Sequence, residues 1–171
     1  EYAKSKGIVD LHINTHGNRL TSDKIRRLVD CGVDRIIISV DGATKDTYES
    51  IRIKGNYDKL VANLEALIGY RNSRGKKKPL IRLQYVKMKE NIHEFEQFRN
   101  QWESKVDVLV GLDYSNRSDV TDRSVVERVP VGRAYCPEPF RRLMVSSNGE
   151  VQMCCVDWSR KYVVGDSKNE K

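Results

Sequence analysis

The stretch RIIISVDG, residues 35–42, predicts a strand with one apolar face and one face that becomes polar at its carboxyl end. Side chains alternate between the two faces of a strand. One face carries Ile36, Ile38 and Val40, and the other carries Ile37, Ser39 and Asp41. Gly42 marks the turn that follows.

Two further segments repeat this alternation, GIVDLHINTHG at 7–17 and LIRLQYV at 80–86. The polar face of the first carries Asp10, His12 and Asn14, and that of the second carries Arg82 and Gln84. A doubly wound sheet or a closed barrel buries both faces of its strands. A single polar face therefore predicts an incomplete barrel with helices outside and a wet cavity inside.

The segments between these strands predict helices. Residues 21–32 start at Thr21 or Ser22 as a cap, carry apolar side chains at helical spacing and stop at Gly32. Residues 43–52 predict a short turn that starts at a cap, and a long helix runs from Tyr57 to Gly75.

A third helix is predicted after residue 90, with Asn91 as its cap and Glu94 three residues on, before a strand at 106–112. The resulting alternation of strands and helices predicts an α/β fold with parallel strands joined by crossovers. Ligands of such folds bind at the carboxyl ends of the strands. The polar ends are Asn14–His16, Ser39–Asp41, and Arg82 with Gln84.

Length and composition allow one core plus a small appendage in these 171 residues. The sequence contains no run of about 18 apolar residues and no signal peptide, so we expect a soluble, cytoplasmic protein without a membrane partner. It opens without Met and enters a predicted strand by Ile8, which is an expected feature of an internal piece of a longer chain.

The net charge of +7 raises the question of an anionic partner. The densest basic run, RNSRGKKK at 71–78, lies where a helix is predicted to end, and cations there interact favourably with the helix dipole. This position favours a solvated helix end over a nucleic-acid site. An anionic substrate or cofactor would also fit the net positive charge of the chain.

Two cysteines, Cys154 and Cys155, follow a hairpin signal at Asn148-Gly149. If Ser147 faces Glu150, Leu143 faces Cys154. Cys136 precedes a Pro-rich turn that could return it toward Cys154.

Three interpretations of these thiols stay open: a metal or iron–sulfur site, packing as small apolar residues, or a disulfide. Adjacent cysteines point to opposite faces of a strand, so Cys155 is the expected bystander. Cys31, at the end of an amphipathic helix, is expected to be a core residue.

Other polar residues give weaker indications of a functional site than the cysteines do. His12 and His16 flank Asn14 and Thr15, which hints at a metal or acid–base site, although a histidine held by its neighbours is the commoner outcome. Ser39 and Asp41 could hold a ribose or an amino group if a ligand is present.

Together, INTHG, RIIISVDGATKDTYESIR, IRLQYVKMKEN and CPEPFRRLMVSSNGEVQMCCVD resemble radical S-adenosylmethionine (SAM) enzymes that carry a C-terminal SPASM-type auxiliary cluster domain. The resemblance implies that residues 1–112 are the third to sixth units of a partial (β/α)6 barrel. Residues 113–135 are then a linker or substrate loop, and residues 136–171 begin the auxiliary domain.

The resemblance also implies roles for single residues. Those implied to bind the cofactor are Ser39, Asp41, Arg52 and Gln84. Those implied to face substrate are Thr15, His16 and Arg82, and those implied to bind metal are Cys136 and Cys154. The implied cofactors are SAM and [4Fe-4S] clusters, and the implied partners are an electron donor such as flavodoxin or ferredoxin and a small-molecule or peptide substrate.

The sequence departs from the family in two respects, of which the first bears on activity: the CxxxCxxC loop does not occur in it. The later auxiliary cysteines do not occur either. We therefore expect an inactive fragment of an enzyme that uses a 5′-deoxyadenosyl radical on a peptide, sugar or other small substrate. The rival hypothesis is a non-catalytic α/β module that binds an anionic ligand and has a zinc-stabilised hairpin.

Overall fold

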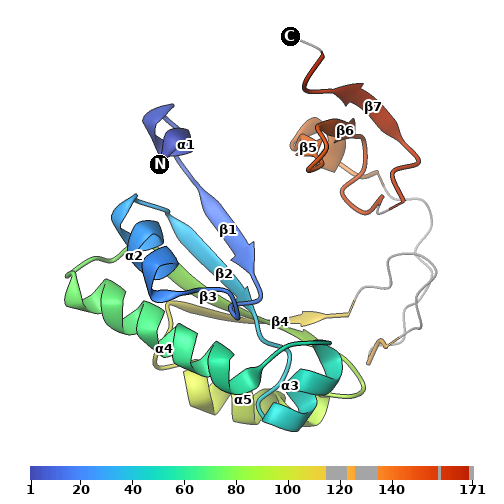
Figure 1. The fold of residues 1–171 in the computed structure, drawn as a ribbon. Helices are drawn as coiled ribbons and strands as arrows, with labels where there is room; N and C mark the ends of the chain where they lie inside the picture. The colour runs from blue at the N-terminus through green and yellow to red at the C-terminus, as the bar shows by residue number, and fades with distance from the viewer. Residues whose placement is uncertain (115–122, 126–134, 158, 170–171) are drawn as a thin grey trace. The chain divides into compact units, whose positions relative to one another are not determined.

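The computed structural model describes residues 1–114, 123–125, 135–157 and 159–169 (Figure 1). The chain divides into two compact units, Glu1–Val126 and Glu127–Lys171, and each is described by itself. The boundary falls inside the predicted linker at 113–135, most of which lies outside the described residues.

The first unit is built on a parallel sheet whose strands follow one another in chain order. The strands are β1 (His12–Thr15), β2 (Arg35–Ser39), β3 (Leu80–Lys87) and β4 (Val108–Asp113). Each pairs in parallel with the next, as the alternation of elements predicted. The α/β class is confirmed.

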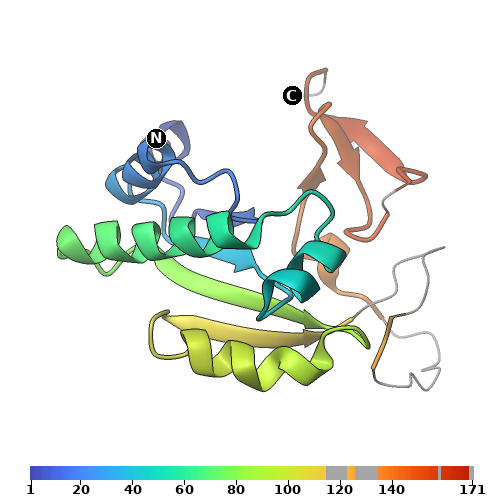
Figure 2. The same cartoon turned by 60° about the horizontal axis from the view of Figure 1, so that its bottom comes forward.

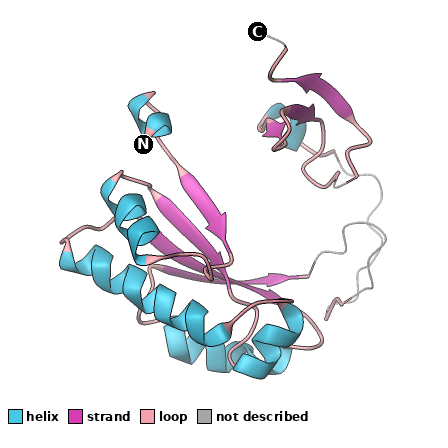
Figure 3. Ribbon diagram, in the orientation of Figure 1, coloured by secondary structure: helices cyan, strands magenta, loops and turns pink. Residues whose placement is uncertain are grey.

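The helices of this unit lie between the strands in sequence. They are α1 (Tyr2–Ser5), α2 (Ser22–Asp30), α3 (Lys45–Ile51), α4 (Tyr57–Ser73), the short 3-10 helix η1 (Ile92–Glu94) and α5 (Phe95–Trp102). Helices α2, α4 and α5 cover the same face of the sheet (Figures 2 and 3). The side chains between sheet and helices are buried, among them Ile36, Ile38, Ile81, Leu83, Leu60, Leu64 and Phe98.

Helix starts follow the expected chemistry at three places. The hydroxyl of Thr21 accepts a hydrogen bond from the Lys24 amide and caps α2, and Thr44 caps α3 in the same way. The Asn56 side chain accepts from the Lys59 amide at 2.7 Å and caps α4. Cys31 packs against the core, as predicted.

The other face of the sheet is not covered by a helix in the described part of the chain. Ile37, Ser39, Arg82 and Gln84 occupy it and are half-buried. The two faces therefore differ as the sequence predicted, with one dry and one partly wet.

Two predicted elements differ from the structure. The first strand is shorter than 7–17, because Leu11 turns to pair with Asp34, whose carboxylate accepts the Leu11 amide at 2.9 Å. Asn91 lies at the predicted cap position, directly before η1, but the expected cap hydrogen bond does not form. Its side chain is instead fully buried among neighbouring backbone groups.

The second unit is antiparallel. Its elements are the 3-10 helix η2 (Glu138–Phe140) and strands β5 (Met144–Val145), β6 (Glu150–Gln152) and β7 (Val163–Asp166), in the order β5-β6-β7. The predicted hairpin forms, but its predicted register is wrong by one residue, because Val145 pairs with Val151. The Ser146 amide donates to the Glu150 carbonyl at 2.9 Å, so the loop has three residues, with Gly149 at φ +94°.

In the described part of the chain, each helix is too short or too polar to cross a membrane.

Gly17 is the turn residue on which the packing below β1 depends. Its φ is +78°, and a Cβ there would lie 2.4 Å from Cδ1 of Leu60 and 3.3 Å from Cγ2 of Ile38. We expect Gly17→Ala to lower the free energy of unfolding in urea by about 1–2 kcal/mol for the left-handed backbone plus about 1–3 kcal/mol for overpacking. Gly32 has nearly the same φ, +79°, but open space around it. Gly32→Ala should therefore cost only the backbone part, and equal losses in the two variants would contradict this account.

Candidate functional site

The pairing of β2 with the middle of β3 brings several predicted residues together. Ser39 pairs with Gln84 and Ile37 pairs with Arg82, so Ser39, Gln84 and Arg82 share the open face of the sheet. The Val40 amide donates to the Gln84 carbonyl at 3.0 Å and closes the pairing at the end of β2. The sheet thus places three predicted residues beside one another on its wet side.

Thr15 and His16 lie apart from this group. Thr15 pairs with Ile38, so its side chain belongs to the helix-covered face, where its hydroxyl accepts the Gly17 amide at 3.2 Å. His16 is exposed in the loop after β1 and lines a pocket with Arg52. Their predicted contact with substrate stays a prediction.

Asp41 is the buried centre of the strand-end region. It has a left-handed backbone, φ +59°, which Asp tolerates better than most residues. One carboxylate oxygen accepts the Val86 amide at 2.7 Å, and the other forms an ion pair with Arg52. Both oxygens are therefore engaged, and Asp41 fixes the loop after β2 to the end of β3.

Asn91 completes this connection from the β3 side. Its amide nitrogen donates to the carbonyls of Asp41 at 3.0 Å and Val86 at 2.9 Å. Its side-chain oxygen accepts the Met88 amide at 2.7 Å. A single buried amide thus satisfies three backbone groups in two loops, which is why it is not available as a cap.

Glu94 reaches from η1 to the start of α3. Its carboxylate accepts the amides of Ala43 at 2.7 Å and Thr44 at 3.1 Å, and the hydroxyls of Thr44 at 2.7 Å and Thr47 at 2.6 Å. A carboxylate at a helix start also interacts favourably with the helix dipole. Glu94 therefore caps a helix that lies about 50 residues away in sequence.

Burial raises the pKa of Glu94, but the hydrogen bonds from Thr47, Thr44 and the backbone outweigh it, so the pKa is lowered overall. The carboxylate form is thus the one the fold stabilises. Sequence reasoning missed the roles of Asn91 and Glu94 because their partners are distant in sequence.

Two arginines of the first unit have buried polar atoms without partners. The Nε of Arg52 and the Nε of Arg82 are buried and have no hydrogen-bond partner among the described residues. Buried polar groups in proteins nearly always have partners. Each of these Nε atoms is a donor that an anionic group of a ligand, such as a carboxylate, could satisfy.

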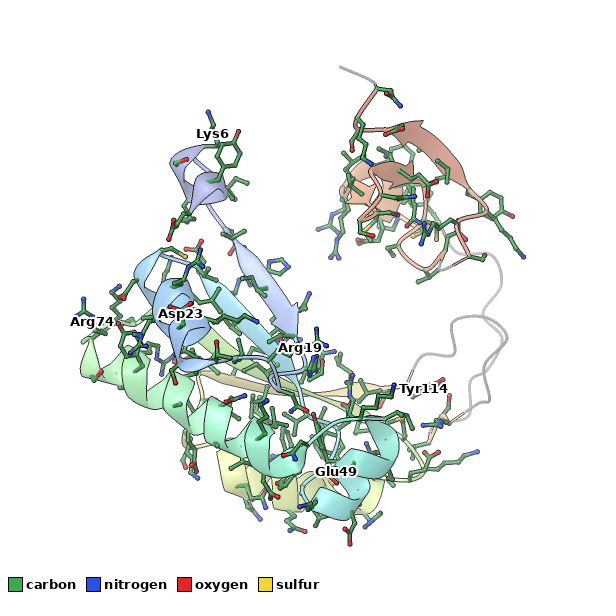
Figure 4. All side chains as sticks on the ribbon, viewed as in Figure 1. Lys6, Arg19, Asp23, Glu49, Arg74 and Tyr114 are labelled. Atoms are coloured by element: carbon green, nitrogen blue, oxygen red, sulfur yellow. The ribbon has the colours of Figure 1, made fainter. Side chains whose placement is uncertain are left out.

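The basic run at 71–78 has a structural role. Arg71 is buried and pairs with Asp107, Lys76 pairs with Asp30 at 3.0 Å, and Lys78 pairs with Asp34 at 2.7 Å. Figure 4 shows Arg74 at the carboxyl end of α4, where the helix-end interpretation places it. These pairs support that interpretation.

The cysteines of the second unit gather at one place. Cys136, Cys154 and Cys155 line a small cavity with Met144 and Met153. Thiolates are ligands of iron–sulfur clusters and zinc. The cavity volume is only about 20 Å³, and the described residues form no group of three or more side chains able to hold a metal. The thiols therefore supply the donor chemistry of a cluster, and they line one cavity in the described residues.

Comparison with known protein families identifies both units. Residues 1–101 match the model of the radical SAM superfamily, which is more than half of the chain. The chain belongs to the radical SAM superfamily. Residues 136–171 match an iron–sulfur cluster-binding domain, SPASM. Comparison with curated proteins gives no match.

Membership of the radical SAM superfamily implies SAM and iron–sulfur clusters as cofactors. The open face carries the Ser39 hydroxyl and the Gln84 amide, and Arg52 after α3 has a buried Nε without a partner, which are donor and acceptor groups of the kind that the polar groups of SAM require. The same membership accounts for the order of the two units, since the matched SPASM segment follows the matched barrel segment.

Glu94 offers a direct test of the strand-end network. We expect Glu94→Ala to lower the free energy of unfolding by about 2–3 kcal/mol, because it leaves buried amides at the start of α3 without an acceptor. Since the folded-state pKa lies below the ordinary value of 4.5, this stabilisation is present above that value. It is lost as the pH falls through the folded-state pKa.

Urea unfolding between neutral and acid pH measures both effects, and Glu94→Gln should flatten the acid limb of the profile. The control is Glu96→Ala, which removes an exposed partner of Arg99 and should cost less than about 1 kcal/mol. Equal losses for Glu94→Ala and Glu96→Ala would refute the capping role.

Proposed function

We propose that this chain forms the SAM- and substrate-facing half of a radical SAM enzyme that acts on a peptide, sugar or other small substrate. The observation that supports it most is the polar strand-end group on the uncovered face, with two arginines whose buried Nε atoms have no partner. Reductive cleavage of SAM at an iron–sulfur cluster would supply the 5′-deoxyadenosyl radical that takes hydrogen from the substrate.

In this proposal, the chain's own residues bind and orient. Arg52 is held by Asp41 and presents its remaining N–H groups to the carboxylate of SAM. Ser39 and Gln84 supply a hydroxyl and an amide on the open face, which can hold ribose hydroxyls. The helix-covered core below them keeps these groups in place.

Other finer assignments are also proposals. We assign Arg82 and His16 to the substrate side, with Thr15 supporting the loop after β1. Cys136 and Cys154 are proposed as ligands of an auxiliary cluster, with Cys155 as a bystander. The chain alone is expected to be inactive, because its sequence has no CxxxCxxC triplet.

Anaerobic reconstitution tests this function. We expect a form extended at both ends to bind iron and sulfide and to produce 5′-deoxyadenosine from SAM and a reductant, measured by chromatography. The 171-residue chain should produce none. A colourless protein that binds zinc and makes no 5′-deoxyadenosine in the extended form would support the binding-module alternative instead.

Two variants of the extended form refine the test. Ser39→Ala and Arg52→Ala should weaken SAM binding, by roughly tenfold for Arg52→Ala, since a charge-assisted hydrogen bond is lost. Calorimetry measures the affinity, and circular dichroism checks the fold. Unchanged affinity in both variants would remove these residues from the site.

A further inference from the structure

A pocket with cationic walls lies between the loop after β1 and the loop that joins α3 to α4. Its volume is about 640 Å³, within the usual range for small-molecule sites. Four cationic side chains line it, Arg19, Arg52, Lys54 and Lys59, and its lining residues include no Asp or Glu. Such a concentration of one charge attracts anions.

The floor of this pocket is held by hydrogen bonds. The buried Asn18 side chain donates to the Tyr48 hydroxyl at 3.3 Å and to the Asn56 carbonyl at 3.1 Å. Its oxygen accepts the Asn56 amide at 2.7 Å. Asn63 donates to the Gly17 carbonyl at 2.9 Å from α4. The two loops are therefore joined, and the pocket exists without a ligand.

Three of the four cationic side chains make no interaction that stabilises the fold in the described residues. In the described structure, Arg19, Lys54 and Lys59 form no ion pair and no side-chain hydrogen bond, whereas Arg52 is paired with Asp41. Figure 4 shows Arg19 near the carboxyl end of β1. This differs from the basic run at 71–78, where aspartates pair with Arg71, Lys76 and Lys78.

Lys54 also occupies a costly backbone conformation. Its φ is +62°, in the turn closed by the hydrogen bond from the Gly55 amide to the Arg52 carbonyl at 2.6 Å. Gly or Asn would adopt this conformation at lower cost. A lysine held there adds a positive charge at the pocket wall at the expense of local stability.

We propose that this pocket binds an oxyanion of the substrate, a phosphate or carboxylate group, through Arg19, Lys54 and Lys59. This inference rests on the proposed function, because it assigns the anion to the substrate of that enzyme. Ile51 and the exposed Ile53 also line the pocket and offer apolar surface to the carbon skeleton of the same molecule. The substrate would then be an acidic small molecule or a residue with an acidic group.

Calorimetry on the full-length protein with pyrophosphate and with succinate tests the site. The first test variant is Lys54→Asn, because Asn tolerates the left-handed backbone at this position. The second is a triple variant that combines Lys54→Asn with Arg19→Gln and Lys59→Gln. We expect Lys54→Asn to weaken binding by roughly tenfold, and wild-type binding to weaken with added salt. Lys77→Gln, at an exposed position outside the pocket, should change the affinity less than twofold. Circular dichroism checks that each variant is folded.

The two probes separate the possible anions: tighter binding of pyrophosphate indicates a phosphate group, and tighter binding of succinate indicates a carboxylate. Affinities that are the same in wild type and the triple variant would overturn the proposal.

SAM binding separates this inference from the proposed function. The triple variant should keep its SAM affinity, because Arg52 is unchanged. An equal loss of SAM and pyrophosphate binding would make the pocket part of the cofactor site and overturn the substrate assignment. If wild type fails to bind SAM but binds pyrophosphate through these cations, the proposed function fails and the anion site stands.

Discussion

The carboxylate of Asp41 is the interaction on which the strand-end region depends. One of its oxygens holds the Val86 amide at the end of β3, and the other holds Arg52 after α3. Asn91 adds a hydrogen bond to the Asp41 carbonyl. The backbone therefore accepts an uncommon conformation at Asp41, because three segments are joined through this single residue.

This connection explains how a sheet with one uncovered face can present a stable binding surface. The dry face is fixed by apolar packing, whereas the polar face has no such packing to position it. Hydrogen bonds made by Asp41, Asn91 and Glu94 replace packing at the loops above the strands. The positive charge of Arg52 is thereby held at the edge of a pocket that contains three more cations.

The alternation of strands and helices was sufficient to predict the α/β fold, and the parity of residues 35–42 and 80–86 predicted its two unlike faces, because burial alternates along a strand. It also placed Ser39, Arg82 and Gln84 on one side. The roles of Asn91 and Glu94 could not be predicted, because their partners lie up to about 50 residues away. The hairpin register was missed because Asn148-Gly149 also fits a three-residue loop, and one residue of difference turns each side chain over.

Amide hydrogen exchange over residues 52–56, with and without SAM, is the most direct test of this account. Asp41→Asn preserves the shape of the side chain and suits the left-handed backbone, but it removes the charge that holds Arg52. Without this charge, residues 52–56 should exchange faster, and SAM should protect them in wild type only. Unchanged exchange, together with equal protection by SAM in both proteins, would contradict this account.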